Sequence, residues 1–349
     1  MALNIASSIA FGDAFRGEIA ALTAAFLWAA ATLMFGQLGK QLAPVVLNLV
    51  KGAFAITFIL LTLLLRAQIK ETPINLSFSD IFYLLLSGGI GIGLGDTAYF
   101  AAINALGARR ALLLETLAPP MAAILAWAFL GEQLSWTAMG GIGCTLAGIV
   151  WVICERSPKQ REKPNQTKAG LSVAMLAVFC QASGVVLSRG VLAGTTIDPL
   201  LSALIRLVAG MIFITALVLG QPWRLGAYST SHSTNPDTPN LDTFNTDNFE
   251  ARSANIKNWR HRWHNSLMAL KQPSLLVAVA IAALLGTYLG IWLQQIALKH
   301  TATGIAQALL ATSPLFVLPM AALLGDHISY RATLGAVIAL SGVWILLAS

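Results

Sequence analysis

The chain has 349 residues, of which 56% are hydrophobic and only 11% are charged, and its mean hydropathy is +0.72. These values exclude a soluble globular protein, in which about a quarter of the residues are charged, and indicate a chain whose solvent is a lipid bilayer. The net charge of +7 does not indicate nucleic-acid binding, because nearly all Lys and Arg residues flank apolar runs, where anionic lipid headgroups are the simpler partner.

The first 16 residues lack a basic stretch followed by an apolar one, so we expect no cleavable signal peptide. Ten apolar runs follow, each long enough to cross a hydrocarbon core of about 30 Å. In chain order they cover residues 19–39, 44–65, 81–106, 108–130, 138–154, 170–192, 199–219, 274–298, 303–324 and 332–347. Each is expected to be a helix, because an open strand would leave backbone groups unpaired in lipid, and the runs do not alternate as barrel strands do. The sequence therefore predicts an all-α, multi-pass protein of the inner membrane with ten transmembrane helices.

The second half of the chain repeats the first, with residues 17–155 matching residues 170–347. The matched positions are Pro44 with Pro199, Lys51 with Arg206, Gly95 with Gly290, Pro119 with Pro314, and GEQLS at 131–135 with GDHIS at 325–329. The separation grows from 155 to 195 positions between the second and third pairs, because the second copy contains a polar loop at about 221–271. Each copy holds five spans, an odd number, so the second copy enters the membrane from the opposite side and the repeats are inverted.

Two long segments contain the same arrangement of a helix, a proline, a second helix and a glycine followed by an acid. They are GDTAYFAAINALGARRALLLETLAPPMAAILAWAFLGEQLS at 95–135 and ALKHTATGIAQALLATSPLFVLPMAALLGDHIS at 297–329. In this repeated pattern the chain resembles the EamA type of the drug/metabolite transporter (DMT) superfamily, over residues 17–347 without the long loop. The resemblance implies ten helices around a central cavity, and commonly the export of amino acids, nucleobases, metabolites or drugs. One departure is that the first span has no acid, whereas the related small multidrug exporters use a Glu there.

Few ionisable residues lie within the predicted spans and away from their ends, namely Lys51, Asp96, Glu115 and Arg206. A charge at the bilayer centre costs at least about 3 kcal/mol, so each is a candidate functional residue. At 1.5 Å per helical residue, Lys51 and Glu115 should lie about 10 Å, and Asp96 about 15 Å, inside the surface that holds the first and third loops. We expect Asp96 or Glu115 to bind a coupling proton or cation, or a substrate amine, with Lys51 favouring the ionised carboxylate. A purely structural ion pair is the alternative.

Arg206 is the counterpart of Lys51 in the second repeat. It should therefore lie in the opposite half of the membrane, where no predicted span offers an acid. Two interpretations are open: the side chain extends to a lipid headgroup, or it faces the cavity and contacts an anionic group.

Several polar and aromatic side chains fall on shared helix faces. Tyr99 follows Asp96 by three positions, and Tyr288, Trp292 and Gln295 form one stripe of the eighth span. They line the solute cavity or, alternatively, pack against neighbouring helices or lipid. The same alternatives apply to three further residues within spans, Trp28, Gln181 and Gln307.

Prolines and glycines mark the third, fourth and ninth spans. Pro119 and Pro314 are expected to kink their helices and to act as hinges. Five glycines between residues 88 and 95 indicate either close helix contact or a broken helix. Small residues at 141 and 145, and again at 335 and 339, favour tight pairing of the fifth and tenth spans.

The segments outside the spans offer no catalytic or metal-binding pattern. Glu132 and Asp326 follow spans four and nine and are interpreted as cap positions, and residues 228–255 are polar enough to be disordered. His261 and His264 lack further ligands, and the three cysteines show no CxxC spacing, so we expect neither a metal nor a cofactor. Without HExxH or GxSxG, an intramembrane enzyme is weakly supported, and a passive channel is a second alternative.

Charges in the loops bear on orientation. The loops after spans five and seven hold eleven Lys and Arg residues, whereas the even-numbered loops hold four. The positive-inside rule then predicts cytoplasmic odd-numbered loops and external termini, although the family resemblance implies internal termini.

Taken together, the sequence predicts a secondary transporter, and not an enzyme, that exports a small organic solute by alternating access with a coupled proton or cation. We expect it to act as a monomer or homodimer among membrane lipids.

Overall fold

The computed structural model describes residues 15–39, 41–67, 77–106, 108–155, 167–220, 264–323 and 330–348. Within these residues, ten helical stretches are long and apolar enough to cross a membrane. They are Arg16–Leu38, Val46–Ala67, Phe78–Ile103, Ala111–Leu130, Trp136–Cys154, Gly170–Gly194, Pro199–Leu217, Pro273–His300, Thr303–Met320 and Tyr330–Leu347. All ten predicted spans are confirmed, with boundaries that differ by a few residues. The predicted disorder at 228–255, His261 and Asp326 lie outside the described residues.

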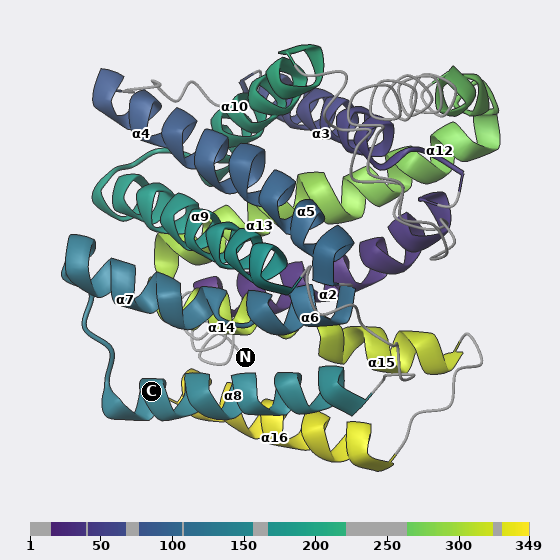
Figure 1. Ribbon diagram of the computed structural model, residues 1–349. Coiled ribbons are helices and arrows are strands. Elements are labelled where there is room, and N and C mark those ends of the chain that lie inside the picture. Colours follow the sequence, from purple (N-terminus) through teal and green to yellow (C-terminus); the bar gives the residue numbers. More distant parts are fainter. Residues whose placement is uncertain are drawn as a thin grey trace, which may run out of the picture.

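The helices divide into two sets that follow the repeats. The first set comprises α2 (Arg16–Leu38), α3 (Pro44–Ala67), α4 (Phe78–Gly88), η1 (Gly89–Gly95), α5 (Asp96–Leu106), α6 (Ala108–Glu115), α7 (Ala118–Leu130) and α8 (Trp136–Glu155). The second comprises α9 (Thr167–Gly194), α10 (Pro199–Gly220), α12 (Pro273–Ala282), η3 (Ala283–Leu289), α13 (Gly290–His300), α14 (Thr303–Leu310), α15 (Ser313–Leu323) and α16 (Tyr330–Leu347). In Figure 1 most helices extend from one side of the picture to the other, and several cross their neighbours at an angle. Five spans in each set make the second set an inverted copy of the first.

The third span of each set contains a π-helical segment at the equivalent place. In the first set η1 lies between α4 and α5, and in the second η3 lies between α12 and α13. The segment η1 packs against α9 and α10, whereas η3 packs against α2 and α3. Each repeat thus inserts its π-helical segment between the first two helices of the other repeat. π-Helical turns are rare and frequent at functional sites.

Glycine makes this interlocking possible at the centre of η1. A Cβ atom added at Gly91 would lie only 3.3 Å from Cα of Gly184 on α9. Small residues promote helix association in membranes because they let backbones approach closely. Of the two interpretations of the glycine-rich third span, close contact is confirmed. The helix is not broken there, but widened into a π-helix.

The fifth and tenth spans, α8 and α16, form a tight pair along the lower edge of the molecule (Figure 1). A Cβ atom at Gly148 would collide with the backbone of Ala339 and Gly335, and one at Gly342 with Thr145. The predicted pairing is therefore confirmed, with contacts between backbones rather than between large side chains.

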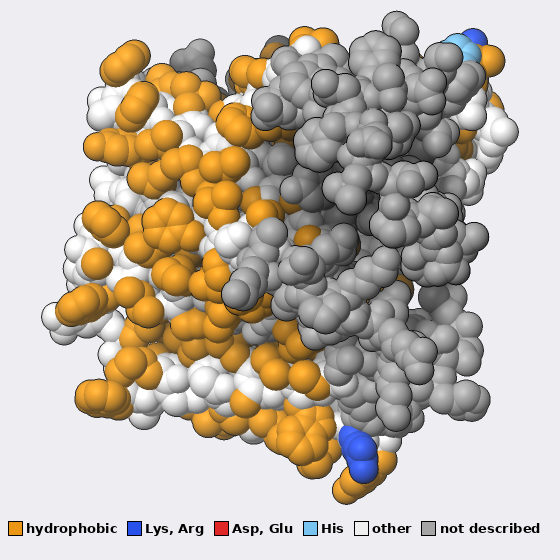
Figure 2. All heavy atoms as spheres, in the orientation of Figure 1, with side chains coloured by type: hydrophobic (Ala, Val, Ile, Leu, Met, Phe, Trp, Pro, Cys, Tyr) orange, Lys and Arg blue, Asp and Glu red, His pale blue; other side chains and the backbone are white. Residues whose placement is uncertain are grey.

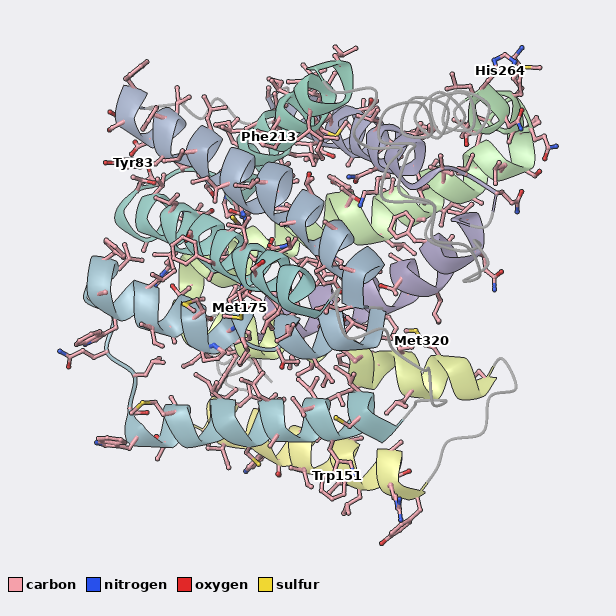
Figure 3. The ribbon with its side chains drawn as sticks, in the orientation of Figure 1. Tyr83, Trp151, Met175, Phe213, His264 and Met320 are labelled. Carbon is pink, nitrogen blue, oxygen red and sulfur yellow. The ribbon has the colours of Figure 1, made fainter. Side chains whose placement is uncertain are left out.

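The outer surface has the composition expected of a protein in lipid. Figure 2 shows apolar side chains over the described helices of one face, with basic side chains only near its edge. Tyr83 on α4 and Trp151 on α8, both labelled in Figure 3, are 46% and 48% exposed. The buried face of α2, by contrast, consists of small residues such as Ala21, Ala24 and Ala29. These small side chains let α2 pack closely against its neighbouring helices.

The α8–α16 contact predicts a specific sensitivity to side-chain size. We expect Gly148→Val to destabilise the fold by about 1–3 kcal/mol, because the added methyl groups overpack the helix interface. Thermal unfolding of the purified protein in nanodiscs measures the effect. The matched control is Gly140→Val on the same helix, where an added Cβ meets nothing within 4 Å. An equal loss of stability in both variants would contradict the packing explanation.

Candidate functional site

The fourth span of each repeat is broken at the equivalent place. Helix α6 ends at Glu115 and α7 begins at Ala118, whereas α14 ends at Leu310 and α15 begins at Ser313. At each break a threonine side chain donates a hydrogen bond of 2.6 Å to a carbonyl of the preceding half-helix, Thr116 to Leu113 and Thr312 to Leu309. The break places Glu115 at the end of a half-helix in the interior of the bundle.

Pro119 and Pro314 lie in the first turns of α7 and α15. Each span is interrupted just before its proline, as a kink requires, because the proline ring has no N–H for the carbonyl one turn earlier. Proline fits this position because its missing N–H would have had no partner in the first helical turn. Their role as hinges stays a prediction.

Asp96 is the centre of a cluster of ionisable side chains. It is the first residue of α5, directly after η1. Its Oδ1 accepts a hydrogen bond of 3.1 Å from Nε2 of Gln181 on α9. The Asp96 charge also interacts with the charges of Lys51 on α3 and Arg206 on α10, and with that of Glu115 on α6. Both repeats contribute to the cluster.

Tyr99 belongs to the same cluster, because its phenol interacts with the carboxyl groups of Glu115 and Asp96. The ammonium group of Lys51 lies 5.3 Å from the ring centroid of Phe35, over its face. Such a cation–π contact partly replaces lost hydration. Lys51, Asp96, Tyr99 and Glu115 are all partly exposed although they lie well inside spanning helices.

The position of Arg206 contradicts one of its two sequence interpretations, the contact with a lipid headgroup. Its side chain does not extend to the membrane surface, since the residue is only 3% exposed. The expectation that no acid lies near it is also wrong, because its charge interacts with that of Asp96. The reason is that η1 packs directly against α10, which brings the start of α5 toward the second repeat.

Gln295 is buried where three helices meet and does not line an open cavity. It is 0% exposed, and its Oε1 accepts hydrogen bonds from Ser188 on α9 at 2.6 Å and from Ser202 on α10 at 3.0 Å. Its Nε2 has no partner among the described residues, and neither does Nε2 of Gln307 on α14. The structure therefore ties Gln295 to the interface of α9, α10 and α13.

Trp292 is not brought together with the ionisable cluster. The guanidinium of Arg66 lies 4.9 Å from the ring centroid of Trp292, and Arg66 forms an exposed ion pair of 3.1 Å with Asp198. The neighbouring Tyr288 hydrogen-bonds Thr62 across the two repeats at 2.8 Å. This stripe of the eighth span therefore packs against α3 near the even-numbered loops.

The sequence analysis missed an ion pair that joins the repeats at that same end. Arg189, counted there among the loop charges, lies within α9, and its Nε is 2.7 Å from Oε1 of Glu132. The same guanidinium donates to the carbonyl oxygens of Leu298 and Lys299 at the end of α13. Glu132 also accepts a hydrogen bond of 2.8 Å from the backbone N–H of Thr303, which caps α14. The cap prediction for Glu132 is confirmed, but its partner could not be found without a tertiary contact.

A groove of about 630 Å³ lies away from the cluster, between α7 and α8. Its walls include Pro120, Trp127, Trp136 and Leu146. None of the predicted site residues lines it, and its apolar walls face the surrounding lipid. Among the described residues, no three His, Cys, Asp or Glu side chains gather as metal ligands, and His264 projects from an outer corner of the molecule (Figure 3).

A family model for EamA-like transporters matches residues 15–154 and 255–348. The chain belongs to the EamA-like transporter family. Its members are transporters, so a multi-pass membrane transporter with a small-molecule solute is the appropriate class. No curated protein matches the chain. A solved structure titled "Crystal structure of protein" has 14% sequence identity and a TM-score of 0.67, over 95% of this chain and 96% of that one. At this identity the likeness supports the fold alone.

The two ion pairs near the even-numbered loops are expected to contribute differently to the stability of the fold. We expect Arg189→Gln to cost about 2 kcal/mol, because the pair is only about 15% exposed and two helix ends lose hydrogen bonds. Arg66→Gln should cost less than about 1 kcal/mol, since that pair is more than 40% exposed. Thermal unfolding of both variants in nanodiscs is the measurement. A larger loss for Arg66→Gln would contradict this ranking.

Proposed function

We propose that this EamA-family protein is a secondary transporter of the inner membrane that exports a small organic solute by alternating access. The observation that carries the proposal is the cluster of Lys51, Asp96, Glu115 and Arg206, to which both repeats contribute within the span of the bilayer. In inverted-repeat transporters, substrate and coupling-ion sites lie near the bilayer midplane at the repeat interface. Tyr99 and Gln181 supply further polar groups there.

The structure contains elements suited to a change of access. At the even-loop end, the Glu132–Arg189 ion pair fastens the first repeat to the second. The breaks after Glu115 and Leu310 leave the fourth and ninth spans as half-helices. Release of the ion pair and rotation about these breaks would open that end, while equivalent contacts form at the other end. The two repeats, residues 17–155 and 170–347, are the moving bodies of this proposal.

Coupling is assigned to the carboxyl groups of Asp96 and Glu115. The buried Oε2 of Glu115 has no hydrogen-bond partner among the described residues. A buried carboxylate without a hydrogen-bond donor favours the binding of a proton or a cation, which neutralises its charge. Protein reconstituted in liposomes with a pH-sensitive dye inside tests the proposal, with panels of amino acids, purines and cationic drugs added under an imposed pH or sodium gradient. Solute flux that ignores both gradients would remove the coupling step, and flux far faster than a carrier cycle would indicate a channel.

We expect Asp96→Asn and Glu115→Gln each to abolish gradient-driven flux without lowering the amount of protein in the membrane. Neither amide can take up the coupling proton, whereas both keep the size of the side chain. Dye-reported initial rates in liposomes measure the effect. Asp80→Asn at the start of α4 is the matched control, because it makes the same change outside the cluster. Full activity in both cluster variants would show that neither carboxylate is the coupling site.

The placed ends of the chain show which loops lie on the side of the two termini. The start of α2 meets Thr301, between the eighth and ninth spans, and Leu346 at the end of α16 meets Gly141 at the start of α8. Both ends of the bundle therefore lie with the even-numbered loops, which hold few basic residues. We expect a C-terminal fusion to a reporter that is active only in the cytoplasm to be inactive. Reporter activity would place the termini inside.

A further inference from the structure

Arg206 is buried without the partners that its charge needs. The residue is 3% exposed, and neither its Nε nor its Nη1 meets a hydrogen-bond acceptor in the described part of the chain. The ion pairs formed by described residues join other arginines, Arg66 and Arg189. A buried cation without a hydrogen-bonded partner strongly destabilises a fold.

On the side of η1, the guanidinium of Arg206 lies beside backbone. Gly91 is the residue of η1 nearest to it, and an added Cβ there would lie 3.7 Å from Arg206 Nη2. The facing residue of α9 is Gly184, which likewise has no side chain. These two glycines pack against each other, so neither offers the guanidinium a side chain that could accept a hydrogen bond.

The amide nitrogen of Gln295 is a further unpaired donor, and the Ser202 side chain that holds Gln295 lies one turn of α10 from Arg206. Ser202 precedes Arg206 by four positions on α10, so the two share a helix face. Ser202 and Ser188 hold the Gln295 side chain by its oxygen, and this leaves the Gln295 Nε2 group without an acceptor. The unpaired groups of Arg206 and Gln295 are therefore all donors, and the missing ligand must supply acceptors.

We propose that Arg206 binds a carboxylate group of the transported solute, with the amide of Gln295 as a second donor. The proposal rests on the transport function proposed above and names the chemical class of its substrate. A planar guanidinium binds a carboxylate through two parallel hydrogen bonds, which a point-like ammonium cannot do. Asp96, whose charge already interacts with Arg206, is the internal carboxylate that the solute would replace or accompany.

Matched probes that differ only at the carboxyl group test the proposal. Phenylacetate, phenylacetamide and phenethylamine form one set, and phenylalanine with phenylalaninamide, and leucine with leucinamide, form two others. Each probe is titrated against the purified full-length protein in nanodiscs, and the shift of the thermal unfolding midpoint gives an apparent Kd. We expect saturable stabilisation by carboxylates of at least one set and none by the corresponding amides.

Substitutions then locate the binding group. Arg206→Gln should weaken carboxylate binding at least about tenfold, since hydrogen bonds to charged groups contribute about 1.5–3 kcal/mol. Arg206→Lys should retain part of the affinity, and Arg66→Gln, outside the cluster, should retain all of it. If Arg206→Gln fails to fold, Arg206→Met takes its place, because an apolar side chain of similar size is often tolerated where a buried charge was. Equal stabilisation by amides, carboxylate binding that survives in Arg206→Gln, or no binding by any carboxylate would overturn the proposal.

Different outcomes contradict the binding proposal and the transport proposal. Asp96→Asn should still be stabilised by carboxylates, although it should not support gradient-driven flux. Carboxylate flux that persists in Arg206→Gln would leave the transport function standing and remove Arg206 as the binding group. Carboxylate binding through Arg206 without flux in liposomes would instead remove the transport function.

Discussion

The packing of each π-helical segment between the first two helices of the opposite repeat is the contact on which the rest of the structure depends. Lipid offers little hydrophobic force between helices, so association rests on close approach of backbones and on polar contacts. Gly91 of η1 and Gly184 of α9 provide that approach, and Ser87 donates to the Gly184 carbonyl oxygen beside them. Because α5 begins where η1 ends, the same contact sets Asp96 against Gln181 of the other repeat.

The scaffold is symmetric, but the charges placed on it are not. Lys51 and Arg206 occupy equivalent positions in the two repeats, and both are basic. Asp96 and Glu115, by contrast, correspond to Ile291 and Leu310 at the separation of 195 that holds for Pro119 and Pro314. Two cations from both repeats therefore meet two acids from the first repeat alone. The symmetric parts explain how two conformations can be exchanged, whereas the asymmetric acids give the cluster its chemistry.

The features that could be predicted from the sequence are those that depend on one segment or one repeated motif. Spans follow from hydropathy, since lipid requires a continuous apolar helix of fixed length. The inverted repeat follows from paired motifs, and the small residues of α8 and α16 predicted their contact. The π-helices have no comparable signature, because one extra residue per turn leaves composition unchanged. Arg189 with Glu132, and Arg206 with Asp96, depend on how helices of different repeats cross, which hydropathy does not encode.

Charge balance links the proposed solute to the proposed coupling. With all four groups ionised, Lys51 and Arg206 balance Asp96 and Glu115 within a low-dielectric interior. A solute carboxylate on Arg206 adds one negative charge beside Asp96, and like charges at close range disfavour the ionised form of both acids. Uptake of a proton by one of the acids restores the balance, so carboxylate and proton bind more tightly together than either does alone. A cationic solute would have the opposite effect and would displace the proton. The charge of the solute therefore determines whether proton and solute occupy the cluster together or in turn.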